Sequence, residues 1–515
     1  MIEVRHLSVH KNDGTELLHD VSFTVSPFDK IAIIGEEGNG KSTLLKIILG
    51  ETAALDYLTI TGEVVRDNEI LGYLPQHLPE KWLDSIPSDF LLQSEPTDEL
   101  RAEDFNRLAL FYGLAAAMYL TPDFLEQDLP LSKLSGGEKV KLQLLKLLGS
   151  PATALLLDEP TNDLDLATLE FLEEFIQNLT IPVLFVSHDE MLLEHCANKV
   201  LHLEQVNLKT KRRATLYSGT YRSYVDERLR GYEKTMQIAR KEQADYLEKK
   251  RKLNDIMNAV HAAQNSISRK DPAGGRLLKK KMHVIKAMAK RFDKESYTTV
   301  DHPEESIDVF FPIITLPPHK KILEITSGSL EVAGRILLEH FDLYVTAKDK
   351  VVITGHNGCG KSLLLQGIYN QLKDRSDLSI GYMPQDYMKG LTGFASAVAF
   401  LAPTGIKQQE ERARELLGAM KFTREEMVRD PAELSDGQKA KLFILKFIKD
   451  GTNVLILDEP TRNFSPLSAP VIRQILTEFT GCIISVSHDR IYNLTVCSRY
   501  LEIKNSHLIE QLPIN

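Results

Sequence analysis

The chain repeats one ordered set of motifs, and this repeat constrains its fold more than any other feature. A glycine-rich segment, a G-Y-x-P-Q pentapeptide, an L-S-x-G-x segment, a hydrophobic run ending in D-E-P-T and a V-S-H-D tetrapeptide occur in that order in each half. The third motif precedes the D-E-P-T aspartate by 24 residues in both halves, and the V-S-H-D histidine follows that aspartate by 30 residues in both. Five ordered motifs with matched spacing do not recur by chance, so we expect two domains built on one plan.

The glycine-rich segments have the form of a phosphate-binding loop. They read GEEGNGKS at 35–42 and GHNGCGKS at 355–362. Each follows a short apolar run, KIAIIG or KVVITG, and precedes a helix-like stretch, STLLKIIL or SLLLQGIY. A loop between a strand and a helix places backbone N–H groups around the phosphates of a nucleotide. We therefore expect a nucleotide in each half.

Together the motifs resemble those of tandem ATP-binding-cassette ATPases, over most of the chain. The resemblance implies an α/β fold with two P-loop ATP-binding-cassette domains in tandem, joined by a long α-helical hairpin linker. It also implies ATP hydrolysis with ATP and Mg²⁺ as cofactors. The expected cassettes are residues 1–218 and 322–515, with a basic helical hairpin at 219–300 and an extended connector at 301–321.

The resemblance assigns roles to the residues at matching positions. Glu159 and Glu459 would act on the attacking water as bases or positioners, and His188 and His488 would contact the γ-phosphate. The Mg²⁺ shell would comprise Ser42, Gln76 and Asp158 in the first half, and Ser362, Gln385 and Asp458 in the second. The nucleotide-binding set in the first half would be Gly35, Glu36, Glu37, Gly38, Asn39, Gly40, Lys41, Ser42, Thr43, Gln76, Ser135, Gly136, Gly137 and Glu138. In the second half it would be Gly355, His356, Asn357, Gly358, Cys359, Gly360, Lys361, Ser362, Leu363, Gln385, Ser435, Asp436, Gly437 and Gln438.

The aromatic side chain expected to stack on adenine is not evident. His10 in the first half and Leu330 in the second occupy the comparable regions. The preference for ATP over GTP therefore rests on the resemblance.

The resemblance also implies that the cassettes pair head to tail, which groups the motifs into two sites. Site two would combine GHNGCGKS with LSGGE at 134–138 and NDLD at 162–165, all regular. Site one would combine GEEGNGKS with LSDGQ at 434–438 and RNFSPL at 462–467, and every one of these segments departs from the usual pattern. We expect site one to turn over more slowly; the alternative is independent drift at tolerant positions.

The charge of the chain is unevenly distributed. The net charge is −10, yet residues 209–294 contain 24 Lys and Arg against nine Asp and Glu, a net of +15. Residues 221–264 contain no proline and only Gly231, which predicts a long helix. In NSISRKDPAGG, at 265–275, we expect Pro272, Gly274 and Gly275 to stop any helix. A second, strongly basic helix, RLLKKKMHVIKAMAKRF, would return as an antiparallel hairpin.

A solvated charged spacer is the simplest interpretation of this segment, but its net charge favours a polyanionic partner. We expect it to bind structured RNA. The RNA-binding residues would be Arg269, Lys270, Arg276, Lys279, Lys280 and Lys281.

Tandem cassettes joined by YSGTY at 217–221 and a basic hairpin resemble the ABC-F family of ribosome-associated ATPases. The resemblance implies a cytoplasmic monomer at the tRNA exit site of the bacterial ribosome, with 23S rRNA and P-site tRNA as partners, and neither membrane nor DNA. Only 58 residues separate Gln76 from Leu134, and 27 follow His488, so we expect no inserted arm and no C-terminal extension. Such members look most like bacterial antibiotic-resistance proteins that protect the large subunit.

Three other functions remain open from the sequence. A housekeeping ABC-F translation factor has the same motifs. An ATPase subunit of a membrane importer would leave the basic segment unexplained, and no run approaches the ~18–20 apolar residues of a membrane span. A DNA-repair ATPase would insert its coiled coil within one cassette. The four cysteines form no CxxC pair, which fits a reducing compartment.

Overall fold

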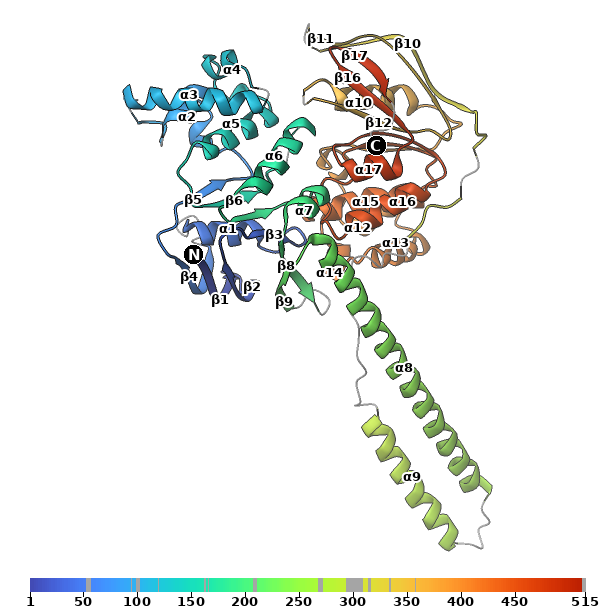
Figure 1. Ribbon diagram of the computed structural model, residues 1–515. Helices are drawn as coiled ribbons and strands as arrows, with labels where there is room; N and C mark the ends of the chain where they lie inside the picture. The colour runs from blue at the N-terminus through green and yellow to red at the C-terminus, as the bar shows by residue number, and fades with distance from the viewer. Residues whose placement is uncertain are drawn as a thin grey trace. The chain divides into compact units, whose positions relative to one another are not determined.

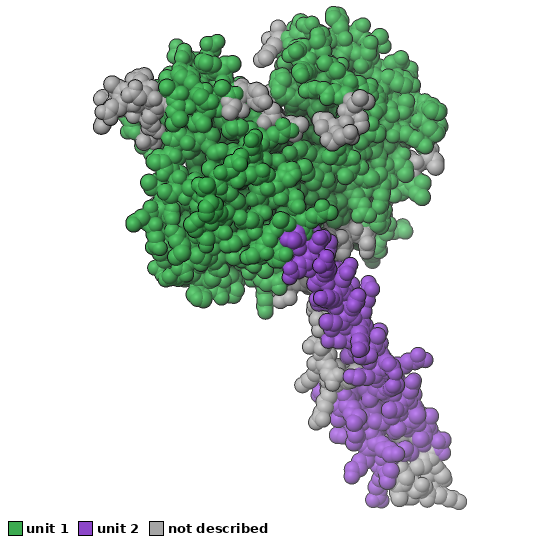
Figure 2. Space-filling view, in the orientation of Figure 1, with its two compact units in different colours: residues 1–222, 304–515 green, residues 223–303 purple. Residues whose placement is uncertain are grey.

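The structure is a computed structural model and describes residues 1–51, 57–93, 95–98, 102–118, 120–161, 164, 166–206, 211–266, 272–292, 309–313, 316–332, 335–356 and 358–511. It divides into two compact units (Figure 2). The first comprises residues 1–222 and 304–515, and the second comprises residues 223–303.

The first unit contains two six-stranded sheets with the same internal order (Figure 1). The first sheet has the order β5 (Leu71–Leu74), β6 (Ala154–Asp158), β7 (Val183–Val186), β3 (Lys30–Ile34), β8 (Lys199–Val206), β9 (Lys211–Ser218). The second has the order β13 (Ile380–Met383), β14 (Val454–Asp458), β15 (Cys482–Val486), β12 (Lys350–Gly355), β16 (Arg499–Lys504), β17 (His507–Gln511). In each sheet only the last pair is antiparallel. The motif repeat thus corresponds to a repeated sheet.

The central strands form because their sequences are mostly apolar. Every residue of β3, β6, β7, β14 and β15 is buried, as expected for parallel strands covered on both faces. Since parallel strands end at the same edge, β3 delivers the glycine loop next to the aspartate that ends β6. The second sheet does the same with β12 and β14.

Two smaller antiparallel sheets complete this unit. One has the order β2 (Glu16–Val25), β1 (Ile2–Lys11), β4 (Leu58–Arg66), and the other pairs β10 (Lys321–Val332) with β11 (Arg335–Thr346). The first packs into the same core as β3: Val4, Val21, Ile31 and Leu44 belong to one buried cluster.

The helices of the second half follow an order along the chain similar to those of the first half. Those of the first half are α1 (Lys41–Leu49), α2 (Pro87–Leu92), α3 (Ala102–Ala117), α4 (Pro122–Glu126), α5 (Gly136–Leu148), α6 (Leu166–Asn178) and α7 (Glu190–Cys196). Those of the second are α10 (Lys361–Leu372), α11 (Met388–Leu391), α12 (Ala397–Leu401), α13 (Lys407–Ala419), α14 (Arg424–Val428), α15 (Asp436–Lys449), α16 (Ala469–Glu478) and α17 (Arg490–Val496). The helices predicted after the two glycine loops are α1 and α10. Both L-S-x-G-x segments open a helix through a capping box, with Ser135 and Ser435 as N-caps.

In chain order, the two cassettes are connected by α8 (Tyr221–Ser266) and α9 (Pro272–Phe292), which run in opposite directions (Figure 1). The prediction that Pro272, Gly274 and Gly275 stop any helix is wrong, because α9 begins at Pro272 and contains both glycines. Proline is tolerated at the first helical position, where its missing N–H would have no partner in the helix. Residues 267–271 of the expected break, and residues 301–308, 314 and 315 of the expected connector, lie outside the described residues.

Candidate nucleotide sites

Both glycine loops hold their lysine in the same way. Lys41 Nζ donates to the carbonyl oxygens of the first two loop residues at 2.7 and 3.0 Å, and Lys361 Nζ does so at 2.8 and 3.0 Å. The loop needs glycine where it passes a neighbouring strand: Gly35 has φ +150°, and a Cβ there would lie 2.2 Å from the carbonyl oxygen of Leu203. Each loop therefore presents a cation and backbone N–H groups at the start of a helix.

The aspartates that end β6 and β14 face the serines of the loops. Ser42 Oγ donates to Asp158 Oδ1 at 2.9 Å. Burial raises the pKa of Asp458 to about 6, and a hydrogen bond from Ser362 offsets part of that effect. Asp458 Oδ1 is buried and has no hydrogen-bond partner in the described part of the chain.

This donor set fits Mg²⁺. The ion takes oxygen ligands and is commonly bound through one or two carboxylates together with substrate phosphates. Asp458 supplies an unpartnered carboxylate oxygen beside a serine hydroxyl. The described ranges contain no group of three or more His, Cys, Asp or Glu side chains suited to a metal.

The two glutamates that follow these aspartates adopt a strained backbone conformation. Glu159 has φ 51° and Glu459 has φ 53°, in the left-handed region that residues other than glycine rarely occupy. Each is buried, and each accepts a hydrogen bond from the backbone N–H of the histidine 29 residues later, His188 or His488. Such strain is typical of functional positions, where the surrounding structure fixes the side chain's direction.

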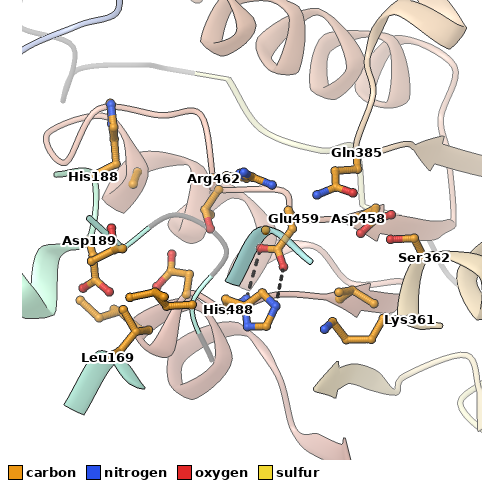
Figure 3. Close-up of a pocket in the computed structure, with 18 of the residues that line it drawn as sticks. Leu169, His188, Asp189, Lys361, Ser362, Gln385, Asp458, Glu459, Arg462 and His488 are labelled. Carbon is orange, nitrogen blue, oxygen red and sulfur yellow. Dashed lines mark hydrogen bonds and ion pairs between the residues drawn. The ribbon is translucent and has the colours of Figure 1, made fainter. Parts of the chain in front are cut away.

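The glutamates nevertheless differ electrostatically. Burial raises the pKa of Glu459 to about 7, against smaller opposing effects from His488, Arg462 and Lys361. Burial also acts to raise the pKa of Glu159, but His188 outweighs it with help from Lys41, and the pKa falls below its ordinary value. The distances agree with this difference. His188 Nε2 lies 3.1 Å from the Glu159 carboxylate. His488 Nε2 lies 3.7 Å from the Glu459 carboxylate (Figure 3).

A cavity of about 470 Å³ contains the second glycine loop. Gln385, Asp458, Glu459 and His488 line it, together with Lys361 and Ser362 (Figure 3). Ser135 and Gly136 of LSGGE also line it, as does Leu164 of the NDLD segment. The structure thus brings together the segments grouped as site two. Asn162, Asp163, Asp165 and Asn357 lie outside the described residues.

A smaller cavity of about 140 Å³ contains residues of site one. Glu36 and Glu37 line it opposite Ser435, Gly437 and Gln438 of LSDGQ, and Asn463 to Ser465 of RNFSPL close it. Gln76 is exposed, and it is not among the described residues that line this cavity. This cavity reaches only the outer part of the first glycine loop, since Lys41, Ser42 and Asp158 are not among the described residues that line it.

Protein groups span site one directly. The backbone N–H of Gly437 donates to Glu37 Oε2 at 3.3 Å, so a glutamate of the first glycine loop touches the N-terminus of α15. His188 Nδ1 lies 2.8 Å from the carbonyl oxygen of Phe464, whose side chain is buried. The unusual residues of site one therefore contact the opposite cassette.

Several residues singled out in the sequence do not line either of these two cavities. His10 is 3.5 Å from Glu16, and Leu330 packs against Gly360 at the start of α10. The predicted linker residues Arg276, Lys279, Lys280 and Lys281 are exposed on α9, while Arg269 and Lys270 lie outside the described residues.

One set of contacts around the first glycine loop was not predicted from the sequence. Asn39 Nδ2 donates to the carbonyl oxygen of Leu203 at 2.9 Å, and its Oδ1 accepts from Gln205 and Arg212 at 2.6 and 3.1 Å. These bonds tie the loop to β8 and β9. No sequence signal could have found them, because the partners are more than 160 residues away.

The ABC transporter family matches residues 18–162 and 338–462, more than half of the chain and one segment in each half. The chain belongs to this family. With a nucleotide-binding loop and a D-E pair in each cassette, it is an ABC-type ATPase, as the sequence predicted.

Several known proteins are similar to this chain over most of its length. The ATP-binding protein YdiF of Bacillus subtilis is 28% identical over 99% of this chain and 81% of its own length. YheS of Escherichia coli is 26% identical over 92% of this chain and 74% of its own length. The ABC transporter F family member 5 of Arabidopsis thaliana is 25% identical, with shares of 96% and 74%.

Solved structures show the same fold. The archaeal recycling factor aABCE1, in complex with the ribosomal stalk protein aP1, superposes with a TM-score of 0.59 at 16% identity, covering 96% of this chain and 87% of its own. The RNase-L Inhibitor also gives 0.59 at 16% identity, with shares of 98% and 90%. The prediction of two α/β cassettes in tandem is confirmed. Among the described residues, no helix combines the length and the apolar character needed to cross a bilayer.

Proposed function

We propose that this chain is a ribosome-associated ABC-F ATPase. It binds the tRNA exit site of the bacterial ribosome and uses ATP binding and hydrolysis to protect the ribosome from antibiotics that target the large subunit. The protein acts in the cytoplasm, with 23S rRNA and P-site tRNA as partners. Its working form is a monomer in which the two cassettes pair with each other.

The observation that carries this proposal is the charge of α9. Its 21 residues include seven Lys and Arg and no Asp or Glu. Met282 and Ile285, one turn apart, are buried, while Lys279, Lys280 and Lys281 are exposed. A helix that buries two apolar residues and exposes a run of three lysines, with no acidic side chain, suits the phosphates of a polyanion.

The names of related proteins support the choice of partner. One relative is named as a member of the F family. A structure titled as a model of ribosome-bound archaeal Pelota and ABCE1 has the same fold, with a TM-score of 0.55 at 14% identity. We extend a ribosomal partner to this chain because neither cassette accounts for the basic hairpin.

The chemistry at site two follows from its residues. Lys361 and the N–H groups of the second glycine loop bind the β- and γ-phosphates. Glu459 orients the attacking water and accepts its proton, and His488 contacts the γ-phosphate. Ser362, Gln385 and Asp458 would hold Mg²⁺, which when bound neutralises charge on the phosphates. Ser135 and Gly136 close the site from the opposite cassette.

Site one uses Glu159, His188, Lys41, Ser42 and Asp158 in the same roles, but we propose that it turns over more slowly. Glu37 and Phe464 already contact the opposite cassette there. Single-turnover hydrolysis by Glu159→Gln and by Glu459→Gln tests this difference. We expect the second substitution to remove most of the fast phase. Equal losses would contradict the proposal.

Ribosome co-sedimentation of the Glu159→Gln, Glu459→Gln double variant tests the function. ATP should close both sites without hydrolysis and retain the protein on ribosomes, whereas ADP should not. Absence of ATP-dependent binding would refute the ribosomal partner. Translation assays with large-subunit inhibitors then separate resistance from a housekeeping factor: failure to restore synthesis with any inhibitor favours the latter.

A further inference from the structure

Four charged residues outside the nucleotide motifs join the two cassettes. We call Glu173, Glu190, Arg473 and Arg490 the charge quartet. Glu173 lies in α6 and Glu190 begins α7, while Arg473 lies in α16 and Arg490 begins α17. The repeat offset of 300 residues that relates Asp158 to Asp458 also relates Glu173 to Arg473 and Glu190 to Arg490. Equivalent positions therefore carry opposite charges.

The quartet forms two crossed ion pairs. Arg473 of α16 lies 2.8 Å from the Glu190 carboxylate of α7. Arg490 of α17 pairs with Glu173 of α6. In the repeat, α16 corresponds to α6 and α17 corresponds to α7. The pairs therefore join α7 to the counterpart of α6, and α6 to the counterpart of α7. An approximate two-fold relation between the repeats requires this crossed pattern.

The pairs are largely withdrawn from water. The exposed fractions of the side chains are 7% for Arg473, 13% for Glu190, 9% for Glu173 and 15% for Arg490. Removing one partner of a buried ion pair is strongly destabilising, because it leaves an uncompensated charge. Like charges at these positions would be worse still.

Neighbouring charges do not distinguish the cassettes. Asp189 lies 3.5 Å from Arg490, and Asp489 lies 3.3 Å from Arg473, but both are the aspartates of the repeated V-S-H-D motif. His195 contacts Glu173 at 2.7 Å within the first cassette. Among the described side chains of this cluster, the two positions of the quartet, 173/473 and 190/490, exchange an acid for a base between the halves.

The sign change selects the partner. Two first cassettes packed in this arrangement would oppose Glu173 to Glu190 twice, and two second cassettes would oppose Arg473 to Arg490 twice. We propose that the charge quartet is a pairing code that restricts closure to one first cassette with one second cassette, and rejects pairing between equivalent cassettes of two chains. This inference does not depend on the ribosomal partner.

Charge exchange in the full-length chain, in the Glu159→Gln, Glu459→Gln background, tests the code. An all-acidic variant carries Arg473→Glu and Arg490→Glu, and an all-basic variant carries Glu173→Arg and Glu190→Arg. A fourfold variant carries all four changes and so exchanges the signs. Sedimentation velocity with and without ATP measures closure and association, and circular dichroism checks the fold.

We expect the parent and the fourfold variant to sediment faster with ATP as compact monomers, and neither uniform variant to do so alone. Mixing the all-acidic and all-basic chains should produce ATP-dependent heterodimers, which a merely structural role would not predict. The code is wrong if the fourfold variant behaves like the uniform ones, or if either uniform variant forms ATP-dependent dimers with itself.

A double-mutant cycle with uncharged replacements keeps the inference testable if the charge-reversal variants do not fold. It uses Glu190→Gln, Arg473→Met and the double variant, with ATP-dependent closure as the readout. Coupling, in which the double variant loses less than the two single losses combined, supports the code. Additive losses overturn it.

Discussion

At the scale of single residues, the two cassettes differ most in their buried glutamates. Burial dominates at Glu459, whereas His188 and Lys41 outweigh it at Glu159. The sequence predicted the positions of both, because D-E-P-T appears twice. It could not predict the difference, which depends on a histidine distance of 3.1 Å in one site and 3.7 Å in the other.

The raised pKa of Glu459 predicts a pH dependence. A carboxyl group with a pKa of about 7 is mostly protonated at pH 6 and then cannot accept a proton from water. In a Glu159→Gln variant, where site two alone turns over, the single-turnover rate should fall about tenfold from pH 8 to pH 6. In Glu459→Gln the remaining rate should change little, because the pKa of Glu159 is lowered. Matching pH profiles of the two variants would contradict this assignment.

The same group predicts a stability effect. A folded-state pKa raised from 4.5 to about 7 means that ionised Glu459 destabilises the fold above pH 7, by at most about 3 kcal/mol. This penalty shrinks as the pH falls below 7 and is gone below about pH 4.5, the ordinary pKa of the group. Glu459→Gln should therefore raise the melting temperature at pH 8 more than at pH 6. Thermal unfolding at the two values measures it, and an equal shift would contradict the cause.

Glu37 is the second residue with a predicted effect. Its carboxylate contacts the N–H of Gly437, at the helix end that faces the nucleotide of site one. A like charge several ångströms from phosphate costs about 1 kcal/mol in water, or about fivefold in affinity. Glu37→Asn should tighten ATP binding at site one by about that factor in a Lys361→Ala background. Glu36→Asn, which removes the same charge without that contact, serves as control and should change less.

At the scale of elements, local patterns predicted the glycine-loop helices and the long linker helix. Apolar runs before each loop became buried strands because parallel sheets cover both faces. The prediction at Pro272 was wrong, because proline is favoured at the first position of a helix, and α9 begins there. The order of the strands within each sheet could not be predicted from the sequence, because it depends on contacts between distant segments.

The apolar residues of α9 allow a matched test of the hairpin. Met282 is 8% exposed and Met288 is 56% exposed on the same helix. Met282→Ala should destabilise the hairpin by about 2–4 kcal/mol, as for other buried Met or Leu to Ala changes. Met288→Ala should change little. Hydrogen exchange of α9 amides measures both, and similar protection in the two variants would contradict the packing.

At the scale of the whole molecule, the repeat predicted two cassettes and the grouping of their motifs. The charge quartet was not predicted, although the same 300-residue offset contains it, because its residues belong to no nucleotide motif. Its meaning depends on which helices meet, and only the structure gives that. The basic hairpin was predicted from its charge, and its partner is the central proposal.

That proposal is tested most directly by reversing the exposed charges of α9. The variant Lys279→Glu, Lys280→Glu, Lys281→Glu is compared with Lys373→Glu, Lys389→Glu, Lys504→Glu, which makes the same charge change at exposed lysines of the second cassette. Both are made in the Glu159→Gln, Glu459→Gln background and sedimented with ribosomes and ATP. We predict that the α9 variant loses at least tenfold in ribosome binding and that the control retains most of it. Equal binding by the two variants would contradict the account.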